Sequence, residues 1–275
     1  MRLSIENYNN FGLFVNALQR PQNVLMTRKK SEVTDSYDCK KFYYTNSYDE
    51  AVNLLKNGYK EPLDKIKSEL KNFCITNRRE NKRSIVNDVF GFVPHVPNAI
   101  LGIPNSMINY KFEQRNIKVI KIVYDMSIVY DEKPETIVKN SINLLKLLIM
   151  LENMGFKTEL FLTSISNDDR KQLFVAPFIK LKEYKTPLNI AKLCFPLVHP
   201  SMLRRIIFKW KETTPTITNS DFNYGYGIVS YKSIGEQKLK ELLIKNNKLK
   251  KSDIYINYYD LYSEDKIKKI AESYK

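Results

Sequence analysis

Oxygen-bearing side chains cluster at two places in the second half of the chain, each directly after an apolar run. The first run covers residues 117–124 and is followed by Asp125, Met126 and Ser127. The second run covers residues 158–164 and leads into a polar segment at 164–169. Open parallel sheets bind ligands beyond the carboxyl ends of their strands, and carboxylate and hydroxyl oxygens suit a hard ion such as Mg²⁺. The alternative is that Asp125 caps a loop or the start of a helix. The candidate Mg²⁺ ligands are Asp125, Ser127, Asp131 and Asp168.

Basic and imidazole side chains form a second set of candidates, for contact with phosphates or with a protein partner. Arg204 and Arg205 are adjacent in a predicted helix, and paired arginines bind phosphates well. The alternative is a packed helix in which the pair bonds carboxylates such as Glu212 or Glu183. The two histidines each stand beside a proline, where an isolated imidazole more often makes a local hydrogen bond. The full candidate set is Arg78, Arg79, Arg83, His95, His199, Arg204, Arg205 and Lys209.

Several common catalytic signatures are absent from the sequence. It contains no GxGxxG or GxxxxGK[ST] phosphate-binding loop and no GxSxG nucleophile elbow. Its three cysteines are widely spaced and form no CxxC pair, which argues against a disulfide framework or a zinc ribbon. There is no secretory leader pattern and no apolar run long enough to cross a bilayer. The sequence therefore predicts a cytoplasmic protein that has no membrane partner.

The chain carries a large positive charge. Its 275 residues include 45 Lys plus Arg and 30 Asp plus Glu, so the formal net charge is 45 − 30 = +15. A field of this size attracts nucleic acids and other polyanions with salt-sensitive affinity. However, only ten of the basic residues are Arg, and the abundance of Lys, Asn, Ile and Tyr is typical of an AT-rich genome. We therefore expect part of the charge to reflect codon usage.

Residues 1–111 are predicted to form a mainly helical region that ends in an irregular loop. Ser47, followed by acidic residues, is a good N-cap, and Gly58 is a good helix end, so a helical hairpin is expected here. Residues 84–111 then lose all periodicity and combine five prolines and glycines with large apolar side chains. Such a loop must pack against the rest of the chain or against a partner, because exposed apolar surface is unfavourable in water.

Residues 112–275 alternate between strand and helix patterns. Strand-like runs occur at 117–124, 158–164 and 173–181, and helical patterns at 136–154 and 236–245. Such alternation predicts βαβ units, with a mostly parallel sheet between two layers of helices. The expected architecture is therefore a three-layer, Rossmann-like α/β domain over residues 112–275.

Three motifs occur in order along the chain: SYDEAVNLLKNGY at 47–59, DVFGFVPHVPNAILGIPNSM at 88–107 and FPLVHPSMLRRIIFKWKE at 195–212. Together they resemble an uncharacterised bacteriophage family described as von Willebrand A-like, although that family carries Asn-Arg-Gly where this chain has Asn140-Ser141-Ile142. The D-x-S order at Asp125 also looks like the start of the D-x-S-x-S metal-adhesion motif of von Willebrand A domains, although the second Ser falls at Val129. The resemblance implies a phage origin, a von Willebrand A-like fold and one surface shared by the loop and the arginine-pair helix. It implies no activity.

The leading hypothesis is a non-enzymatic interaction module that binds nucleic acid or a phage or host protein through the apolar loop and the basic residues. The reason is that the ligand end of the expected sheet offers oxygen atoms but no complete catalytic set. A second hypothesis is a divalent-metal-dependent enzyme acting on nucleic acid, with Asp125 and either Asp131 or Asp168 holding Mg²⁺. A third is a virion component whose positive charge contacts packaged DNA.

Overall fold

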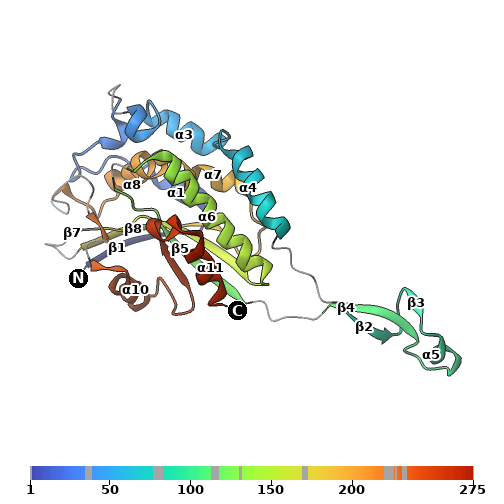
Figure 1. Ribbon diagram of the computed structural model, residues 1–275. Coiled ribbons are helices and arrows are strands. Elements are labelled where there is room, and N and C mark those ends of the chain that lie inside the picture. The colour runs from blue at the N-terminus through green and yellow to red at the C-terminus, as the bar shows by residue number, and fades with distance from the viewer. Residues whose placement is uncertain are drawn as a thin grey trace.

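Figure 1 shows a central sheet covered by helices and a smaller sheet beyond them. The structure is a computed structural model, and it describes residues 2–34, 39–76, 83–112, 118–129, 132–168, 173–219, 226, 228–230 and 234–274. The fold is of the α/β class, as the alternation of strand and helix patterns predicts.

Five strands lie side by side across the central sheet. In order they are β10 (Ile254–Asn257), β5 (Val119–Asp125), β6 (Lys157–Thr163), β8 (Leu173–Lys182) and β1 (Arg2–Tyr8). Two short strands extend this sheet: β7 (Ser166–Asp168) pairs with the start of β8, and β9 (Ile228–Val229) pairs with β7.

The sheet contains one antiparallel step within its five main strands. β10, β5 and β6 are parallel to one another, as expected, and β1 is parallel to β8. β6 and β8 are antiparallel, because the connection between them is too short for a crossover that returns the chain to the same end of the sheet. The predicted parallel arrangement therefore holds on each side of this step but not across it.

Helices cover both faces of the central sheet. One face carries α1 (Phe11–Ala17), α3 (Tyr48–Asn57), α4 (Leu63–Thr76), α6 (Pro134–Asn153), α7 (Ile190–Val198), the π-helical turn η3 (Met202–Ile207) and α8 (Phe208–Thr213). The other face carries α10 (Glu236–Lys245), while α11 (Glu264–Glu272) packs against α6. The short turns are η1 (Lys30–Glu32), η2 (Cys39–Tyr43) and η5 (Tyr258–Tyr262).

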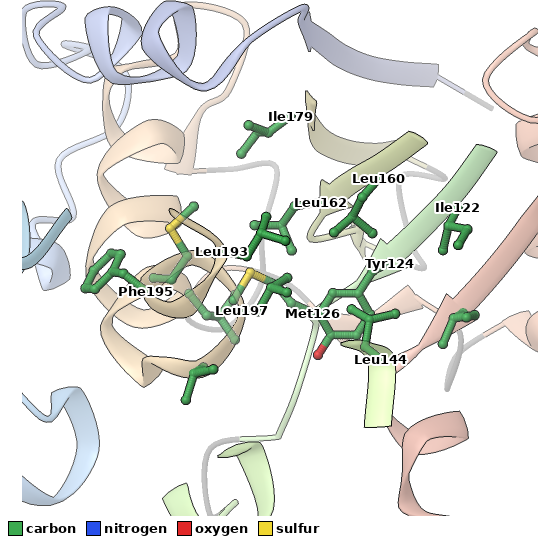
Figure 2. Close-up of a cluster of buried hydrophobic side chains, with 14 of the residues drawn as sticks. Ile122, Tyr124, Met126, Leu144, Leu160, Leu162, Ile179, Leu193, Phe195 and Leu197 are labelled. Atoms are coloured by element: carbon green, nitrogen blue, oxygen red, sulfur yellow. The ribbon is translucent and has the colours of Figure 1, made fainter. Parts of the chain in front are cut away.

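Alternate side chains of each strand point to opposite faces and so belong to two apolar clusters. The larger cluster lies between the sheet and α7, and Figure 2 shows Ile122, Tyr124, Leu160 and Leu162 of the sheet near Leu193, Phe195 and Leu197 of the helix. The smaller cluster joins Val123 of β5 to Leu239 and Leu243 of α10. Burial of both clusters holds the carboxyl ends of β5 and β6 at one edge of a rigid core.

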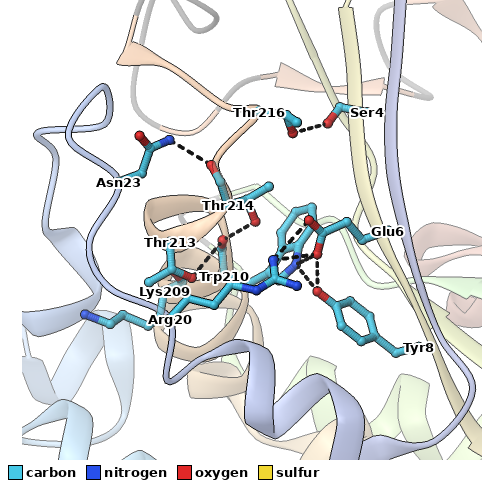
Figure 3. Close-up of polar contacts among 10 residues, drawn as sticks. All are labelled: Ser4, Glu6, Tyr8, Arg20, Asn23, Lys209, Trp210, Thr213, Thr214 and Thr216. Atoms are coloured by element: carbon cyan, nitrogen blue, oxygen red, sulfur yellow. Dashed lines mark hydrogen bonds and ion pairs between the residues drawn. The ribbon is translucent and has the colours of Figure 1, made fainter.

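The predicted helical region at residues 1–111 contributes a strand, β1, to the central sheet. The end of this strand is bonded to α8, as Figure 3 shows. Trp210 Nε1 donates to the hydroxyl of Tyr8 at 2.8 Å and to Glu6 Oε2 at 3.2 Å, and Arg20 forms an ion pair with Glu6 at 2.9 Å. As predicted, Ser47 caps α3 by accepting the N–H of Glu50 at 3.1 Å. The described residues before position 77 therefore belong to the α/β body.

The segment predicted to be an irregular loop at 84–111 folds into a small antiparallel sheet. Its strand order is β2 (Arg83–Asp88), β4 (Met107–Phe112) and β3 (Val93–Pro94), with the short helix α5 (Val96–Ile100) between β3 and β4. The six-residue pairing of β2 with β4 satisfies the backbone groups that an irregular loop would leave to water. The prolines and glycines of this segment interrupt the alternation of apolar and polar residues, so the sequence did not predict these strands.

Candidate functional site

The small sheet and α5, residues 83–112, form a surface that we call the apolar arm. Phe90, Ile100 and Leu101 expose 77%, 79% and 73% of their surface. Other large apolar side chains of the arm that are exposed are Ile85, Val89, Phe92, Val93, Val96, Ile103 and Tyr110. No residue of the arm belongs to either apolar cluster of the described chain. The arm therefore presents its apolar side chains to the outside instead of packing them into the core.

Local contacts give the arm a defined shape. The rings of Phe92 and Tyr110 stack with their centres 4.7 Å apart, and the N–H of Phe92 donates to the carbonyl of Ile108 at 3.0 Å. Gly91 lies so close to β4 that a Cβ atom there would sit 2.2 Å from the same carbonyl oxygen. His95 caps α5, because its Nδ1 accepts the N–H of Asn98 at 3.4 Å. His95 thus makes the local hydrogen bond that its sequence context predicts.

The arm carries few charged residues. Within residues 83–112 they are Arg83, Asp88 and Lys111, in a chain of which 27% is charged. The predicted contact residues Arg78 and Arg79 lie outside the described residues, and only the backbone of Arg83 is described. The described part of the arm therefore exposes many large apolar side chains and few charged ones.

Arg205 is buried, which overturns its predicted place on a partner-binding surface. It is 0% exposed, and its guanidinium group lies over the ring of Tyr43. The group donates to the hydroxyl and the carbonyl of Thr45, at 2.7 and 2.8 Å, and to the carbonyls of Ser31 and Val33, at 2.8 and 3.0 Å. These bonds hold the N-terminal chain against η3.

Arg204 is buried in the same way, and its prediction is corrected for the same reason. It donates to the carbonyl of Phe42 at 2.7 Å and to that of Val129 at 3.4 Å, and its guanidinium group lies over the ring of Phe42. The alternative prediction of a packed helix is correct. The bonds described for the pair reach backbone carbonyls and Thr45 instead of the expected carboxylates.

His199 is also inside the protein, with 3% of its surface exposed. Its Nδ1 accepts the N–H of Ser201 at 3.1 Å, and its ring packs against Tyr59 and Phe195 at centre distances of 4.6 and 5.2 Å. Burial lowers the pKa of the imidazole to about 4, an effect that the charge of Glu50 partly opposes. His199 is therefore a neutral packing group that fastens α7 to the helical hairpin, and it is not available to a surface partner.

Lys209, the last of the predicted contact residues, forms an ion pair with Glu32. The pair joins α8 to η1, beside the segment that Arg205 holds. Residues 195–212 therefore mainly hold the N-terminal chain on the α/β body. The shared surface that the sequence resemblance implied for this helix and the loop does not form, because the arginine pair points inward.

Asp125 lies at the carboxyl end of β5, where the sequence placed it, and is fully buried. Its Oδ1 accepts the N–H groups of Ser127 and Ile165 at 3.0 and 3.2 Å, and its Oδ2 accepts the hydroxyl of Tyr255 at 2.9 Å. Burial raises the pKa of the carboxyl group, and these three hydrogen bonds oppose the rise. The carboxylate therefore bonds the loops after β5 and β6 to β10, which agrees with the alternative prediction that it caps a loop.

Of the four predicted Mg²⁺ ligands, Asp125 and Ser127 are the two whose side chains the structure describes. Ser127 lies next to Asp125, and its hydroxyl is 3.2 Å from that of Ser164. Asp131 lies outside the described residues, and only the backbone of Asp168 is described. In the described ranges no group of three or more His, Cys, Asp or Glu side chains could hold a metal ion. Asp125 already accepts three hydrogen bonds, and the Mg²⁺ site stays a prediction from the sequence.

A buried lysine at the same edge of the sheet was not singled out from the sequence. Lys211 of α8 is 2% exposed, and its Nζ donates to Ser166 Oγ at 2.5 Å and to the carbonyl of Tyr226 at 3.0 Å. Burial lowers the pKa of this amine to about 7, and the charge of Asp125 partly opposes the shift. In the sequence, Lys211 is one of several charged residues of a predicted helix, and nothing near it in the chain distinguishes it from Lys209.

The model of one protein family, described as Domain of unknown function (DUF7192), matches residues 2–275. No curated protein matches the chain, and no solved structure matches it. Among the described residues, no helix is both long enough and apolar enough to pass through a bilayer.

Proposed function

Because the chain belongs to the DUF7192 family, whose description assigns no function, we propose its role from its own surface. The proposed function is an interaction module that binds a protein partner through the apolar arm. The supporting observation is the exposure of ten large apolar side chains on one defined structure of about thirty residues.

Exposure on this scale is unusual for a surface that serves only to contact water. Contiguous apolar patches on soluble proteins mark sites where another surface excludes water. Buried apolar and aromatic side chains also supply most of the binding energy of protein interfaces. Phe90, Ile100 and Leu101 are the proposed anchors, since they are the most exposed apolar side chains of the arm.

The low charge of the arm favours a protein over a nucleic acid. Nucleic-acid binding depends on Lys and Arg side chains that replace the counterions of phosphates. The two basic residues of the arm, Arg83 and Lys111, stand at its ends, and between residues 85 and 110 it has one acidic residue and no basic one. Of the predicted phosphate contacts, Arg204, Arg205 and His199 are buried, and Lys209 is paired with Glu32. An apolar pocket or groove on a protein is the complementary surface.

Site-specific photocrosslinking tests this proposal. A benzophenone amino acid at position 100 of the arm is compared with one at Tyr184, which is exposed but lies outside the arm. Irradiation of cells of the source organism is expected to give a protein adduct of defined mass from position 100 only. The Leu101→Asp change should reduce that adduct at least tenfold.

Two results would count against the proposal. Adducts that are the same at positions 100 and 184 would show that the arm has no particular partner, and crosslinks to nucleic acid would favour the earlier nucleic-acid hypothesis. An adduct of twice the chain mass would identify the partner as a second copy of the protein.

The phage origin, the von Willebrand A-like fold and the virion role stay predictions from the sequence.

A further inference from the structure

The small sheet of the apolar arm has one apolar face. β2 and β4 pair without a register shift, so Ile85 lies opposite Tyr110, and β3 places Val93 opposite Ile108. In an antiparallel sheet, residues that lie opposite each other share a face, as do residues two positions apart along one strand. The face defined in this way consists of Ile85, Val93, Ile108 and Tyr110. The ring of Phe92 stacks on that of Tyr110 and extends it.

The other face of the small sheet is more polar. It carries Asp88, which lies opposite Met107, and Asn109, which lies opposite Val86. A sheet with one apolar and one polar face normally packs its apolar face against a second layer. Ile85 keeps 68% of its surface exposed, and no residue of the arm belongs to either apolar cluster. The described part of one chain therefore does not supply that second layer.

We infer that a second copy of the chain supplies the missing layer, an inference that rests on the interaction role proposed for the arm. The apolar faces of two arms stack about a two-fold axis and form a small β-sandwich. Because the contact is between identical faces, Ile85 and Tyr110 of each copy both lie within it. Asp88 lies on the outer face of the sandwich and remains in water.

The distribution of charge favours contact between copies through the arm. The arm has two basic residues and one acidic residue, so its net charge is 2 − 1 = +1, and the rest of the chain carries 15 − 1 = +14. Two copies that met through their main bodies would repel each other. Contact through the arms brings the copies together at a surface with little charge.

The exposed apolar area of the arm is sufficient for a stable dimer. Ten large apolar side chains of the arm expose between 41% and 79% of their surface. At roughly 200 Å² for a large side chain, they amount to about 1,000 Å². Each partner of a stable interface of standard size contributes about 800 Å². The contact therefore includes most of these side chains, among them Ile100 and Leu101 of α5.

Analytical ultracentrifugation of the purified full-length chain, treated with nuclease, tests the inference. The expected species has twice the mass of the 32.4 kDa chain. The dimer should be at least as abundant in about 0.5 M salt as in about 0.1 M salt, because salt screens the repulsion between the two positive bodies. Ile85→Lys places a charge on the apolar face and should raise the dissociation constant of the dimer about 100-fold or more.

Val86→Lys is the matched control, since it adds the same charge one position along β2 and on the opposite face. Its dissociation constant should stay within about threefold of the wild-type value, because charges outside an interface contribute little to affinity. Hydrogen exchange in peptides of residues 83–112 shows whether each variant keeps the arm folded. If one of them does not, Tyr110→Lys and Asn109→Lys form a second pair, on the apolar face and the opposite face respectively.

A wild-type chain that sediments as a monomer at micromolar concentrations would overturn the inference. Equal dissociation constants for the two members of a folded variant pair would also overturn it. The interaction role itself would stand if the benzophenone at position 100 then gave an adduct with a different protein in cells. The loss of every specific adduct from position 100, together with a monomeric chain, would overturn both.

Discussion

Arg205 Nε donates a hydrogen bond to Thr45 Oγ1 at 2.7 Å, across 160 positions of sequence. The same guanidinium group also bonds the carbonyls of Ser31, Val33 and Thr45. Arg is suited to this position because its planar group offers five donors in fixed directions and remains charged when buried. One side chain of η3 therefore holds two separate parts of the N-terminal chain on the α/β body.

Replacement of Arg205 should destabilise the protein strongly. Arg205→Ala leaves several buried acceptors without a donor, so we expect the free energy of unfolding to fall by about 3 kcal/mol or more. Arg205→Lys should recover only part of the loss, because an ammonium group cannot reach all four acceptors from one position. Urea denaturation followed by circular dichroism measures both values.

Lys192→Ala is the control for these variants, since Lys192 is an exposed basic residue on α7. Its free energy of unfolding should stay within about 0.5 kcal/mol of the wild-type value. An Arg205→Ala protein as stable as this control would show that the arginine does not hold the N-terminal chain.

Acid should weaken the fold through His199. The pKa of this group is about 4 in the folded protein and about 6.5 when it is exposed, so the unfolded chain binds the proton more readily. Its contribution to stability is complete above pH 6.5 and is lost as the pH falls toward 4. Between pH 7.5 and 5 we expect a loss of about 2 kcal/mol from this group, at 1.4 kcal/mol per pH unit below 6.5.

His199→Asn separates this effect from other titrations. The amide oxygen can accept the N–H of Ser201, as Nδ1 does, but it does not titrate in this range. Denaturation curves at pH 7.5 and pH 5 should therefore differ less for the variant than for the wild type, by about 2 kcal/mol. The same pH dependence in both proteins would exclude His199 as the source.

Removal of the apolar arm should leave the main body folded. The arm contributes no residue to either apolar cluster, so replacement of residues 83–112 by a short Gly-Ser linker removes no core contact. We expect the Tm of the shortened chain to stay within about 3 °C of the wild-type value, because surface changes alter stability little. Loss of cooperative unfolding in calorimetry would show that the arm supports the core.

Gly91→Ala should disturb the arm alone. The added Cβ would lie 2.2 Å from the carbonyl oxygen of Ile108, so β4 must move away from residue 91. Hydrogen exchange followed by mass spectrometry should show faster exchange in peptides of residues 83–112 and unchanged exchange in β5 and β6. Asn105→Ala, an exposed change in the same segment, is the control and should exchange like the wild type.

The secondary structure of the α/β body was largely predictable because its signals are local. Ser47 and Gly58 mark the ends of α3, and Gly155, with a φ of 92°, follows α6 as expected. The small sheet of the arm was not predictable, because its strands are short and because β2 is stable as a strand only when it pairs with β4. The same holds for β1, whose place beside β8 depends on residues more than 160 positions later.

The site was predicted only in part. Asp125 stands at the carboxyl end of β5, as the strand pattern indicated, and His95 and His199 make the local hydrogen bonds that their contexts favoured. The arginine pair was placed on a surface, but it is buried. A sequence shows that a side chain carries charge, but the burial of that charge depends on acceptors that distant segments supply.

The sequence by itself determined the composition of the apolar arm and the class of fold. Prolines, glycines and apolar residues at 84–111 required either a packed loop or a partner surface, and alternating strands and helices required an α/β core. Only the tertiary structure decided that the arm stays outside the core, that Arg205 points inward and that Lys211 reaches Ser166. The physical reason is that hydrogen bonding and exclusion of water depend on which surfaces meet, and residues far apart in the chain supply those surfaces.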